Sequence, residues 1–391
     1  MTQTAEPSRL ALPTQVDPLS ASEASFARGA VVLGMHRSGT SAVAGLLVGA
    51  GFDAGRDEDL WPADESNPKG YFERAELVTG NDGLLARLGG SWDCPPAQDT
   101  VLATRDESLD QVRAEVRALL SRSGGAPVVL KDPRISVLLP LWWPVLKDDF
   151  CAVLVLRNPL ETARSLARRD GMSVAAGLAL WEVYLTAVLA GLEGYVVHLA
   201  RYDKVLADPG AAAALVQGVA ARLRPDLAAD LHGEDWASAL APELHRNQAT
   251  ATDLDEYATQ QQRSLWAHLS SLGDGPQLLT SPESLRRPSG AALATIRQDA
   301  GLRARLGEAT SRLTEQAELM EAADRERDLR GSRVAELETT VSYLGQRVEA
   351  AAVERDQRGQ RVAELEAQLV ELQAGVALAD GLRARADAAE R

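Results

Sequence analysis

The first residues that could do chemistry lie in the segment 30–41, which reads AVVLGMHRSGTS. Its apolar, β-branched start predicts a buried parallel strand over 30–33, and the apolar run 42–48 that follows it predicts a helix. Gly34 and Gly39 keep the GxxxxG spacing of a phosphate-binding loop. A strand, a glycine-bounded turn and a helix N-terminus point backbone N–H groups at an anion. The segment therefore predicts a phosphate-binding loop.

The residue after the second glycine is Thr40, where a nucleotide triphosphatase carries a lysine. The fixed cation of this loop is instead Arg37, whose planar guanidinium suits a tetrahedral oxyanion. We therefore expect the loop to bind a phosphate group, but not in the manner of a magnesium-bound triphosphate. A tight strand–helix turn without a ligand is the alternative for so short a pattern.

Three further apolar runs predict strands over 126–130, 151–156 and 195–199. Helical spacing lies between and after them, at 76–88, 109–120, 161–169, 174–192 and 211–223. Strands that alternate with helices predict an α/β fold, a three-layer parallel sheet with helices on both faces.

Ligands of such sheets bind beyond the carboxyl ends of the strands. Each predicted strand ends in polar, mostly cationic residues, which are His36-Arg37, Lys131-Asp132, Arg157 and Arg201-Tyr202. The parallel arrangement brings these ends to one edge of the sheet. We therefore expect an anion site there.

Composition limits the function further. The chain has 41 Lys and Arg against 56 Asp and Glu, a formal net charge of −15, which argues against binding nucleic acid. Cys94 and Cys151 form neither a disulfide framework nor a metal cluster, and we expect a reducing cytoplasm. Residues 1–27 lack a signal-peptide pattern and predict a disordered leader. The segment 174–192 is apolar enough to span a membrane, but Glu182 inside it favours a buried helix and no transmembrane segment.

The pattern changes towards the C-terminus. Residues 254–272 predict a closing helix, and the Gly- and Pro-containing segment 273–291 predicts a linker. From 292 to 391 the chain predicts a long coiled-coil helix, because apolar residues recur at heptad spacing: Val334, Leu337, Val341, Leu344, Val348, and then Val362, Leu365, Leu369, Leu372, Val376. The sequences RGSRVAELE and RGQRVAELE begin at Arg330 and Arg358, 28 residues or four heptads apart.

This helix predicts self-association, with a parallel dimer as the default, or a helical partner. A disordered charged tail is the alternative. Arg355 and Arg358 weaken the apolar seam between its two halves.

Four motifs, in order, resemble the sulfotransferase family that uses 3′-phosphoadenosine 5′-phosphosulfate (PAPS), particularly its bacterial carbohydrate-type and tyrosylprotein-sulfotransferase-like members. They are GMHRSGTS, NPKGYFE, LKDPR and LRNPLETARSLARRDG. The resemblance covers 28–208 and at most extends to 272. It implies a P-loop-type sulfotransferase domain over 28–272, which moves a sulfuryl group from PAPS to a hydroxyl without a metal.

The resemblance also implies roles for matching residues. Arg37 would hold the leaving phosphate, within a 5′-phosphosulfate loop made of His36, Ser38, Gly39, Thr40 and Ser41. Arg157 and Ser165 match the pair that binds the 3′-phosphate, and Tyr202 matches a residue that lines the nucleotide pocket. The other interpretations are a surface salt bridge for Arg157, a plain helix hydroxyl for Ser165 and a core position for Tyr202.

Lys131 matches a strand-end lysine that stabilises charge on the transferred group, with Asp132 as its orienting neighbour. The alternative is that KDPR is only a structural turn. The acceptor hydroxyl needs a general base, for which Glu73 is the candidate. Asp64, Glu65 and His36 are the competing candidates.

The loop 51–72 is expected to line the acceptor side, because Trp61 and Tyr71, together with Trp92, offer rings that stack on sugars. A carbohydrate or glycolipid acceptor is therefore expected, with a peptide or a small alcohol left open. Two other functions compete with this one. An ATP-using P-loop kinase is disfavoured by Thr40 in place of lysine, and a non-catalytic scaffold acting through the coiled coil is disfavoured by the cationic strand ends.

Overall fold

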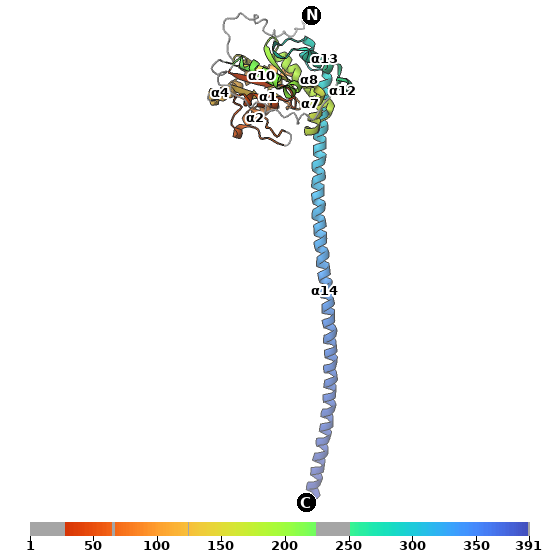
Figure 1. Cartoon of the computed structure of the whole chain (residues 1–391). Coiled ribbons are helices and arrows are strands. Elements are labelled where there is room, and N and C mark those ends of the chain that lie inside the picture. Colours follow the sequence, from red (N-terminus) through yellow and green to blue (C-terminus); the bar gives the residue numbers. More distant parts are fainter. Residues whose placement is uncertain (1–27, 65–66, 124, 224–250, 390–391) are drawn as a thin grey trace, which may run out of the picture. The chain divides into compact units, whose positions relative to one another are not determined.

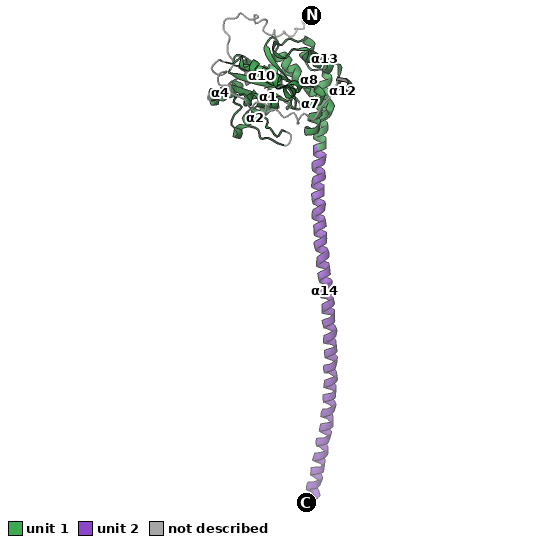
Figure 2. Ribbon diagram, viewed as in Figure 1, with its two compact units in different colours: residues 1–306 green, residues 307–391 purple. Residues whose placement is uncertain are grey.

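The computed structural model describes residues 28–64, 67–123, 125–223 and 251–389. The chain divides into two compact units, residues 1–306 and 307–391 (Figure 2). The predicted leader 1–27 and the candidate base Glu65 lie outside the described residues.

Unit 1 is built around a five-stranded sheet with the strand order β2-β1-β3-β4-β5. The first four strands are parallel and the fifth is antiparallel to β4. The strands are β1 (Gly29–Leu33), β2 (Val128–Lys131), β3 (Phe150–Leu156), β4 (Val196–Arg201) and β5 (Gly275–Leu278). β1 lies between β2 and β3, so its loop is flanked by the ends of both neighbours. The predicted α/β fold is confirmed, with each parallel strand within three residues of its expected bounds.

Helices cover both faces of the sheet (Figure 1). Alternation along β1 shows why, since Val31 and Leu33 pack in one apolar cluster while Ala30 and Val32 pack in another. Besides the start of the long C-terminal helix, the helices in the described part of unit 1 are α1 (Thr40–Gly49), α2 (Ala75–Arg87), α3 (Gln98–Ala103), α4 (Arg105–Arg122), α5 (Arg134–Val137), α6 (Leu139–Leu146), α7 (Pro159–Asp170), α8 (Val174–Gly191), α9 (Tyr202–Ala207), α10 (Pro209–Ala220), α12 (Ala251–Tyr257) and α13 (Gln260–Ser271). The first cluster is covered by α2, α6 and α8, and the second by α1 and α10.

The helix α8 is the core helix that the sequence predicts. It is long and apolar enough to cross a membrane, yet 78% of it is buried inside the structure. Its carboxylate, Glu182, accepts a hydrogen bond from the backbone N–H of Ser289 at 2.6 Å. This donor compensates for part of the cost of burying the carboxylate, whose other oxygen has no hydrogen-bond partner.

The segment 273–291 is not the linker that the sequence suggested. It contains β5, which pairs with β4, and a 3₁₀ turn (Glu283–Leu285), and both Leu279 and Leu285 are buried. Pro276 has no N–H to donate, and an edge strand is the place in a sheet that accepts such a residue. The predicted closing helix 254–272 is likewise divided. Thr259 caps α13 in a capping box with Gln262 and so separates it from α12.

A single long helix, α14 (Gly290–Ala389), ends the described chain. Its first turns belong to unit 1, where Ala292, Ile296 and Asp299 are buried. The predicted long C-terminal helix is confirmed. Its pairing into a coiled coil stays a prediction, because the heptad residues are exposed in the single chain.

The buried His198 predicts acid sensitivity of unit 1. Neither of its ring nitrogens has a hydrogen-bond partner, and burial, assisted by Arg222, lowers its pKa to about 4. The unfolded chain, with a pKa of about 6.5, binds more protons between these values, so stability falls as the pH drops through this window. We expect unit 1 to lose about 2–3 kcal/mol from this residue between pH 7.5 and 4.5.

Urea unfolding followed by tryptophan fluorescence measures this loss in unit 1 alone, because all seven tryptophans precede residue 267. In His198→Leu, which cannot titrate, the pH dependence should shrink by that amount. An equal acid loss in the variant and the natural chain would contradict the assignment.

Candidate active site

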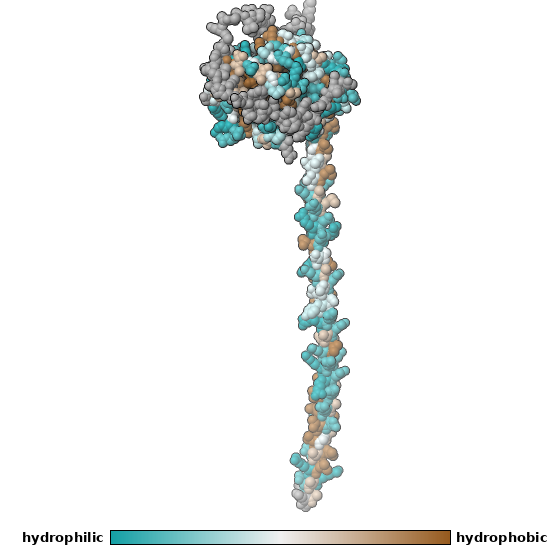
Figure 3. Space-filling view, viewed as in Figure 1, coloured by the Kyte–Doolittle hydropathy of each residue, from teal (hydrophilic) through white to brown (hydrophobic). Residues whose placement is uncertain are grey.

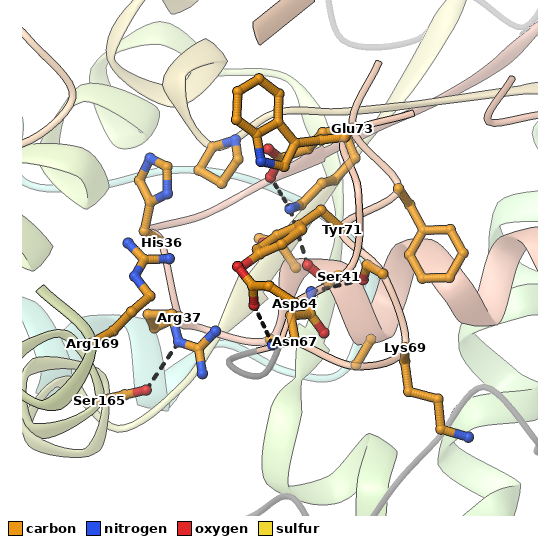
Figure 4. Close-up of a pocket in the computed structure, with 18 of the residues that line it drawn as sticks. His36, Arg37, Ser41, Asp64, Asn67, Lys69, Tyr71, Glu73, Ser165 and Arg169 are labelled. Atoms are coloured by element: carbon orange, nitrogen blue, oxygen red, sulfur yellow. Dashed lines mark hydrogen bonds and ion pairs between the residues drawn. The ribbon is translucent and has the colours of Figure 1, made fainter. Parts of the chain in front are cut away.

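A cavity of about 640 Å³ lies beyond the carboxyl ends of β1, β2 and β3. Its wall combines the loop after β1, the loop 61–73, the end of β2 and the helix α7 (Figure 4). Among the described residues, seven cationic side chains and three carboxylates line it: Arg37, Lys69, Lys131, Arg134, Arg157, Arg168 and Arg169, and Asp64, Glu73 and Asp170. This excess of cations in a chain with a net charge of −15 indicates a site for an anion.

The loop between β1 and α1 is held in an open turn. Arg37 and Gly39 both have a positive φ, 66° and 96°. Ser38 Oγ donates to the carbonyl of Met35 at 2.6 Å. Ser136 Oγ accepts from Gly34 N at 3.0 Å and donates to its carbonyl at 3.1 Å. Since Gly39 has no side chain to cap α1, no side chain occupies the helix N-terminus, which could accept an anion; that it binds one stays a prediction.

The position of Gly39 requires glycine for a second reason. A Cβ built there would lie 2.0 Å from Tyr202 Cδ2. The ring of Tyr202 is therefore pressed against the loop backbone, and the guanidinium of Arg157 lies 4.7 Å from the ring centroid. Tyr202 lines the cavity, so it is more than a core residue.

Arg157 and Ser165, the predicted pair, meet at Arg37. Arg157 Nη1 donates to the carbonyl of Arg37 at 3.0 Å. Figure 4 shows the second contact, in which Arg37 Nε donates to Ser165 Oγ at 3.1 Å. Arg157 also forms a salt bridge with Glu161, in the first turn of α7. This salt bridge is buried, so it is not the surface salt bridge of the alternative interpretation. Burial and the neighbouring Arg169 lower the pKa of Arg37. An anion bound here would relieve that crowding of positive charge.

Lys131 connects the loop to the candidate base. Its Nζ donates to Ser41 Oγ at 3.1 Å and forms a close ion pair with Glu73 Oε1 (Figure 4). Both side chains are almost fully buried. Burial raises the pKa of the Glu73 carboxyl, against the opposing effect of Lys131. A carboxylate with a raised pKa is a better proton acceptor than an exposed one.

Asp132 does not orient Lys131, contrary to the expectation. It accepts from Asn81 Nδ2 at 2.8 Å and from Arg134, at the backbone N and at Nη1. Successive residues of a strand point to opposite faces, so Lys131 faces α1 while Asp132 faces α2. Asp132 therefore shapes the turn, as the structural interpretation of KDPR holds, and fixes Arg134 in the cavity wall.

Arg201 does not join the anion site either. Its guanidinium pairs with Asp274 at 2.8 Å and donates to the carbonyls of Ser270 and Leu272. The strand β4 borders β5, and its terminal cation holds the end of α13 beside that edge. Three of the four strand ends therefore supply cations to the cavity.

The competing bases have other environments. His36 lies 4.7 Å from Trp92, centroid to centroid, and burial together with Arg134 and Arg169 lowers its pKa well below the ordinary value. Asp64 accepts from the hydroxyl of Tyr71 at 2.8 Å and from the N–H of Asn67, which makes it part of a turn. Glu73 is favoured by these contacts, although its role stays a prediction.

The three aromatic residues expected on the acceptor side, Trp61, Tyr71 and Trp92, all line the cavity. Arg168 and Arg169, which follow Ser165 by three and four residues, were not predicted as cavity residues. Their spacing in SLARRDG places them on the same face of α7 as Ser165. Arg134, whose place depends on the distant Asp82 and Asp132, was not predicted there either.

The first turns of α14 fix the wall that carries Trp92. Arg303 bridges Asp299 at 2.8 Å and Asp93 at 2.9 Å. Asp299 also accepts from the backbone N–H of Ser173 at the start of α8. The neighbour of Asp93, Trp92, packs against the ring of His36 in a tilted arrangement and against the guanidinium of Arg169. Residues far apart in the sequence are thus joined into one side of the cavity.

No protein-family model matches the chain, and no curated protein matches it. Similar solved structures include the sulfotransferase domain of the Synechococcus PCC 7002 olefin synthase, at 13% identity over 70% of this chain and 94% of that one, with a TM-score of 0.31. The sulfotransferase domain from the curacin biosynthetic pathway has 12% identity over 69% and 96%, with a TM-score of 0.31. Sulfotransferase STF1 from Mycobacterium tuberculosis H37Rv has 18% identity over 63% and 77%, with a TM-score of 0.29. Similarity of this degree carries no conclusion about activity, so the function is inferred from the site.

The buried pair of Lys131 and Glu73 predicts strong energetic coupling. In Lys131→Met the carboxylate is left buried without its cation, so we expect a loss of about 3–5 kcal/mol in the free energy of unfolding. Glu73→Gln should also be costly, and the double variant should lose clearly less than the sum of the two. Urea unfolding followed by tryptophan fluorescence gives all three values.

The matched control is Lys69→Met, which removes an exposed lysine from the same cavity and should change stability little. Additive effects of the two substitutions, within about 0.5 kcal/mol, would show that the ion pair is not formed.

Proposed function

We propose that unit 1 is a sulfotransferase that moves a sulfuryl group from PAPS to a hydroxyl of an acceptor. One observation carries the proposal. Lys131 contacts a hydroxyl of the anion loop, Ser41, and the buried carboxylate Glu73 at the same time. An anion-binding loop, a cation and a candidate base therefore meet at one point, which is what transfer of an anionic group to an alcohol requires.

The residues present suit a nucleotide that carries both a 5′-phosphosulfate and a 3′-phosphate. The loop 36–41 and the N-terminus of α1 would hold the first group. Arg157 and Ser165, joined through Arg37, would hold the second. More than one guanidinium on this wall supports a ligand that carries more than one anionic group. Tyr202, packed between Gly39 and Arg157, would line the space between them.

The proposed chemistry is an in-line displacement at sulfur. PAPS would supply the sulfuryl group, whose bond to the 5′-phosphate breaks as its bond to the acceptor oxygen forms, leaving adenosine 3′,5′-bisphosphate. Glu73 takes the proton of the acceptor hydroxyl. Lys131 has three N–H donors, of which Ser41 and Glu73 engage two, and the third stabilises charge on the transferred group. Arg37 neutralises the leaving phosphate.

No metal ion is needed for this scheme, because side-chain cations neutralise the developing charge. An ATP-using kinase needs a carboxylate that holds magnesium beside the loop hydroxyl. Here the carboxylate of Glu73, which shares the Lys131 ammonium with the loop hydroxyl of Ser41, is paired with that ammonium. That contact favours the sulfotransferase over the kinase. A purely structural scaffold has no need of a buried ion pair, whose desolvation is costly.

We propose a carbohydrate or glycolipid as the acceptor, in the cytoplasm. The rings of Trp61, Tyr71 and Trp92 line the cavity, and flat apolar faces beside polar groups suit a sugar. The two cysteines, Cys94 and Cys151, are free, as they would be in a reducing compartment.

The role of Glu73 predicts a defined loss of turnover. Glu73→Gln should lower the rate of adenosine 3′,5′-bisphosphate release from PAPS, measured with a panel of alcohol acceptors, by about 10²–10⁴-fold. Since burial raises the pKa of Glu73 and the base must be ionised, the rate of the natural chain should fall with decreasing pH at a value above the ordinary pKa of glutamate.

Glu76→Gln is the matched control, since this exposed carboxylate lies on α2 outside the cavity wall and should keep full turnover. A large loss in Asp64→Asn together with full activity in Glu73→Gln would move the role of base to Asp64.

A further inference from the structure

Unit 2 is a helix that buries almost nothing of its own. From Ala304 to Ala389 every side chain except that of Ala352 is exposed, and Figure 3 shows apolar side chains spaced along the polar helix. An isolated helix gains little stability in water, because helices in proteins are stabilised mainly by packing of an apolar face. The apolar side chains of unit 2 therefore need a partner surface that runs along the helix.

We propose that residues 313–376 pair with a second copy of this chain as a parallel, in-register, two-stranded coiled coil. One heptad register runs without interruption through the segment. Its a positions include Val334, Val341, Val348, Val362, Leu369 and Val376. Its d positions include Leu337, Leu344, Leu365 and Leu372. These side chains are about half to two-thirds exposed in the single chain. Valine at a with leucine at d favours two parallel strands.

Arginines at core positions set the register. Arg327 and Arg355 occupy a positions and Arg330 and Arg358 occupy d positions, once in each 28-residue repeat. Parallel in-register pairing places every layer against its own copy, so that apolar layers meet apolar layers and arginines meet arginines. A shift by one or two heptads would instead put the arginines against core residues that are mostly apolar.

Each arginine layer is accompanied by a glutamate at the preceding g position. Glu326 pairs with Arg330 and Glu354 pairs with Arg358 within the helix. In a parallel pair the g side chain also borders the partner's next a position, which holds Arg327 or Arg355. Both copies thus bring a carboxylate to the cationic layers, and this offsets the repulsion between the arginines.

The flanking charges fit the same arrangement. Arg333 and Arg361 lie at g, and Glu338 and Glu366 lie at e, five residues further on. In a parallel coiled coil a g residue faces the partner's e residue of the next heptad, so each arginine faces a glutamate. In the single chain these arginines make i,i+3 pairs with Glu336 and Glu364 on the exposed surface. Such pairs are weak and leave the arginines able to bridge to a partner.

Thiol cross-linking of the full chain tests orientation and register together. Leu365→Cys, at a d position, should give a disulfide-linked dimer on mild oxidation, because only parallel in-register pairing brings this position next to its own copy. Ala367→Cys, two residues away on the outer face, is the matched control and should not cross-link. The natural chain, with Cys94 and Cys151, gives the background.

Charge exchange tests the partner. Arg333→Glu/Arg361→Glu and Glu338→Arg/Glu366→Arg should each weaken the dimer about tenfold or more, as measured by light scattering at decreasing concentration. A mixture of the two variants should recover the mass of a dimer. A monomeric natural chain, or a dimer in which Leu365→Cys fails to cross-link and the mixture shows no recovery, would overturn the proposal. None of these measurements depends on the proposed sulfotransferase activity.

Discussion

The candidate site depends on the buried ion pair between Lys131 and Glu73. Neither charge is tolerable in the interior without the other, and each comes from a different part of unit 1. Lys131 is the last residue of β2. Glu73 ends the loop 61–73, where its carbonyl accepts from the N–H of Trp61 at 2.7 Å. The pair therefore fixes the end of the loop 61–73 beside the end of β2 and keeps Ser41, at the start of α1, within reach of the same ammonium.

The other charged residues of the cavity surround the ion pair of Lys131 and Glu73 with further cations. In a protein with a net charge of −15, this cavity has an excess of cations in its described wall, and the low-dielectric wall strengthens their attraction for an anion. Two of these cations are held by carboxylates that do not line the cavity, since Asp132 holds Arg134 and Glu161 holds Arg157. The carboxylates orient the cations before any ligand arrives, and preorganised charge is what makes electrostatic stabilisation effective.

The sequence predicted the elements with strong local signals. The four apolar, β-branched runs became β1 to β4. The GxxxxG spacing of Gly34 and Gly39 predicted the turn that joins β1 to α1. Prediction from the sequence failed where the outcome depends on distant residues. The edge strand β5 exists because β4 offers an unpaired edge to a Pro-containing segment, which no local pattern reveals. The roles of Asp132 and Arg201 depend on which way each side chain points and on its partners, Asn81 and Asp274, which lie far away in the sequence.

The central claim is that the cavity recognises a nucleotide with a 3′-phosphate, and calorimetric titration tests it most directly. Adenosine 3′,5′-bisphosphate should bind the natural chain, while 5′-AMP and ATP with magnesium should bind far more weakly. Arg157→Ala should remove the preference for the 3′-phosphate. Equal binding of 5′-AMP and the bisphosphate, or a preference for ATP with magnesium, would contradict the assignment of this site.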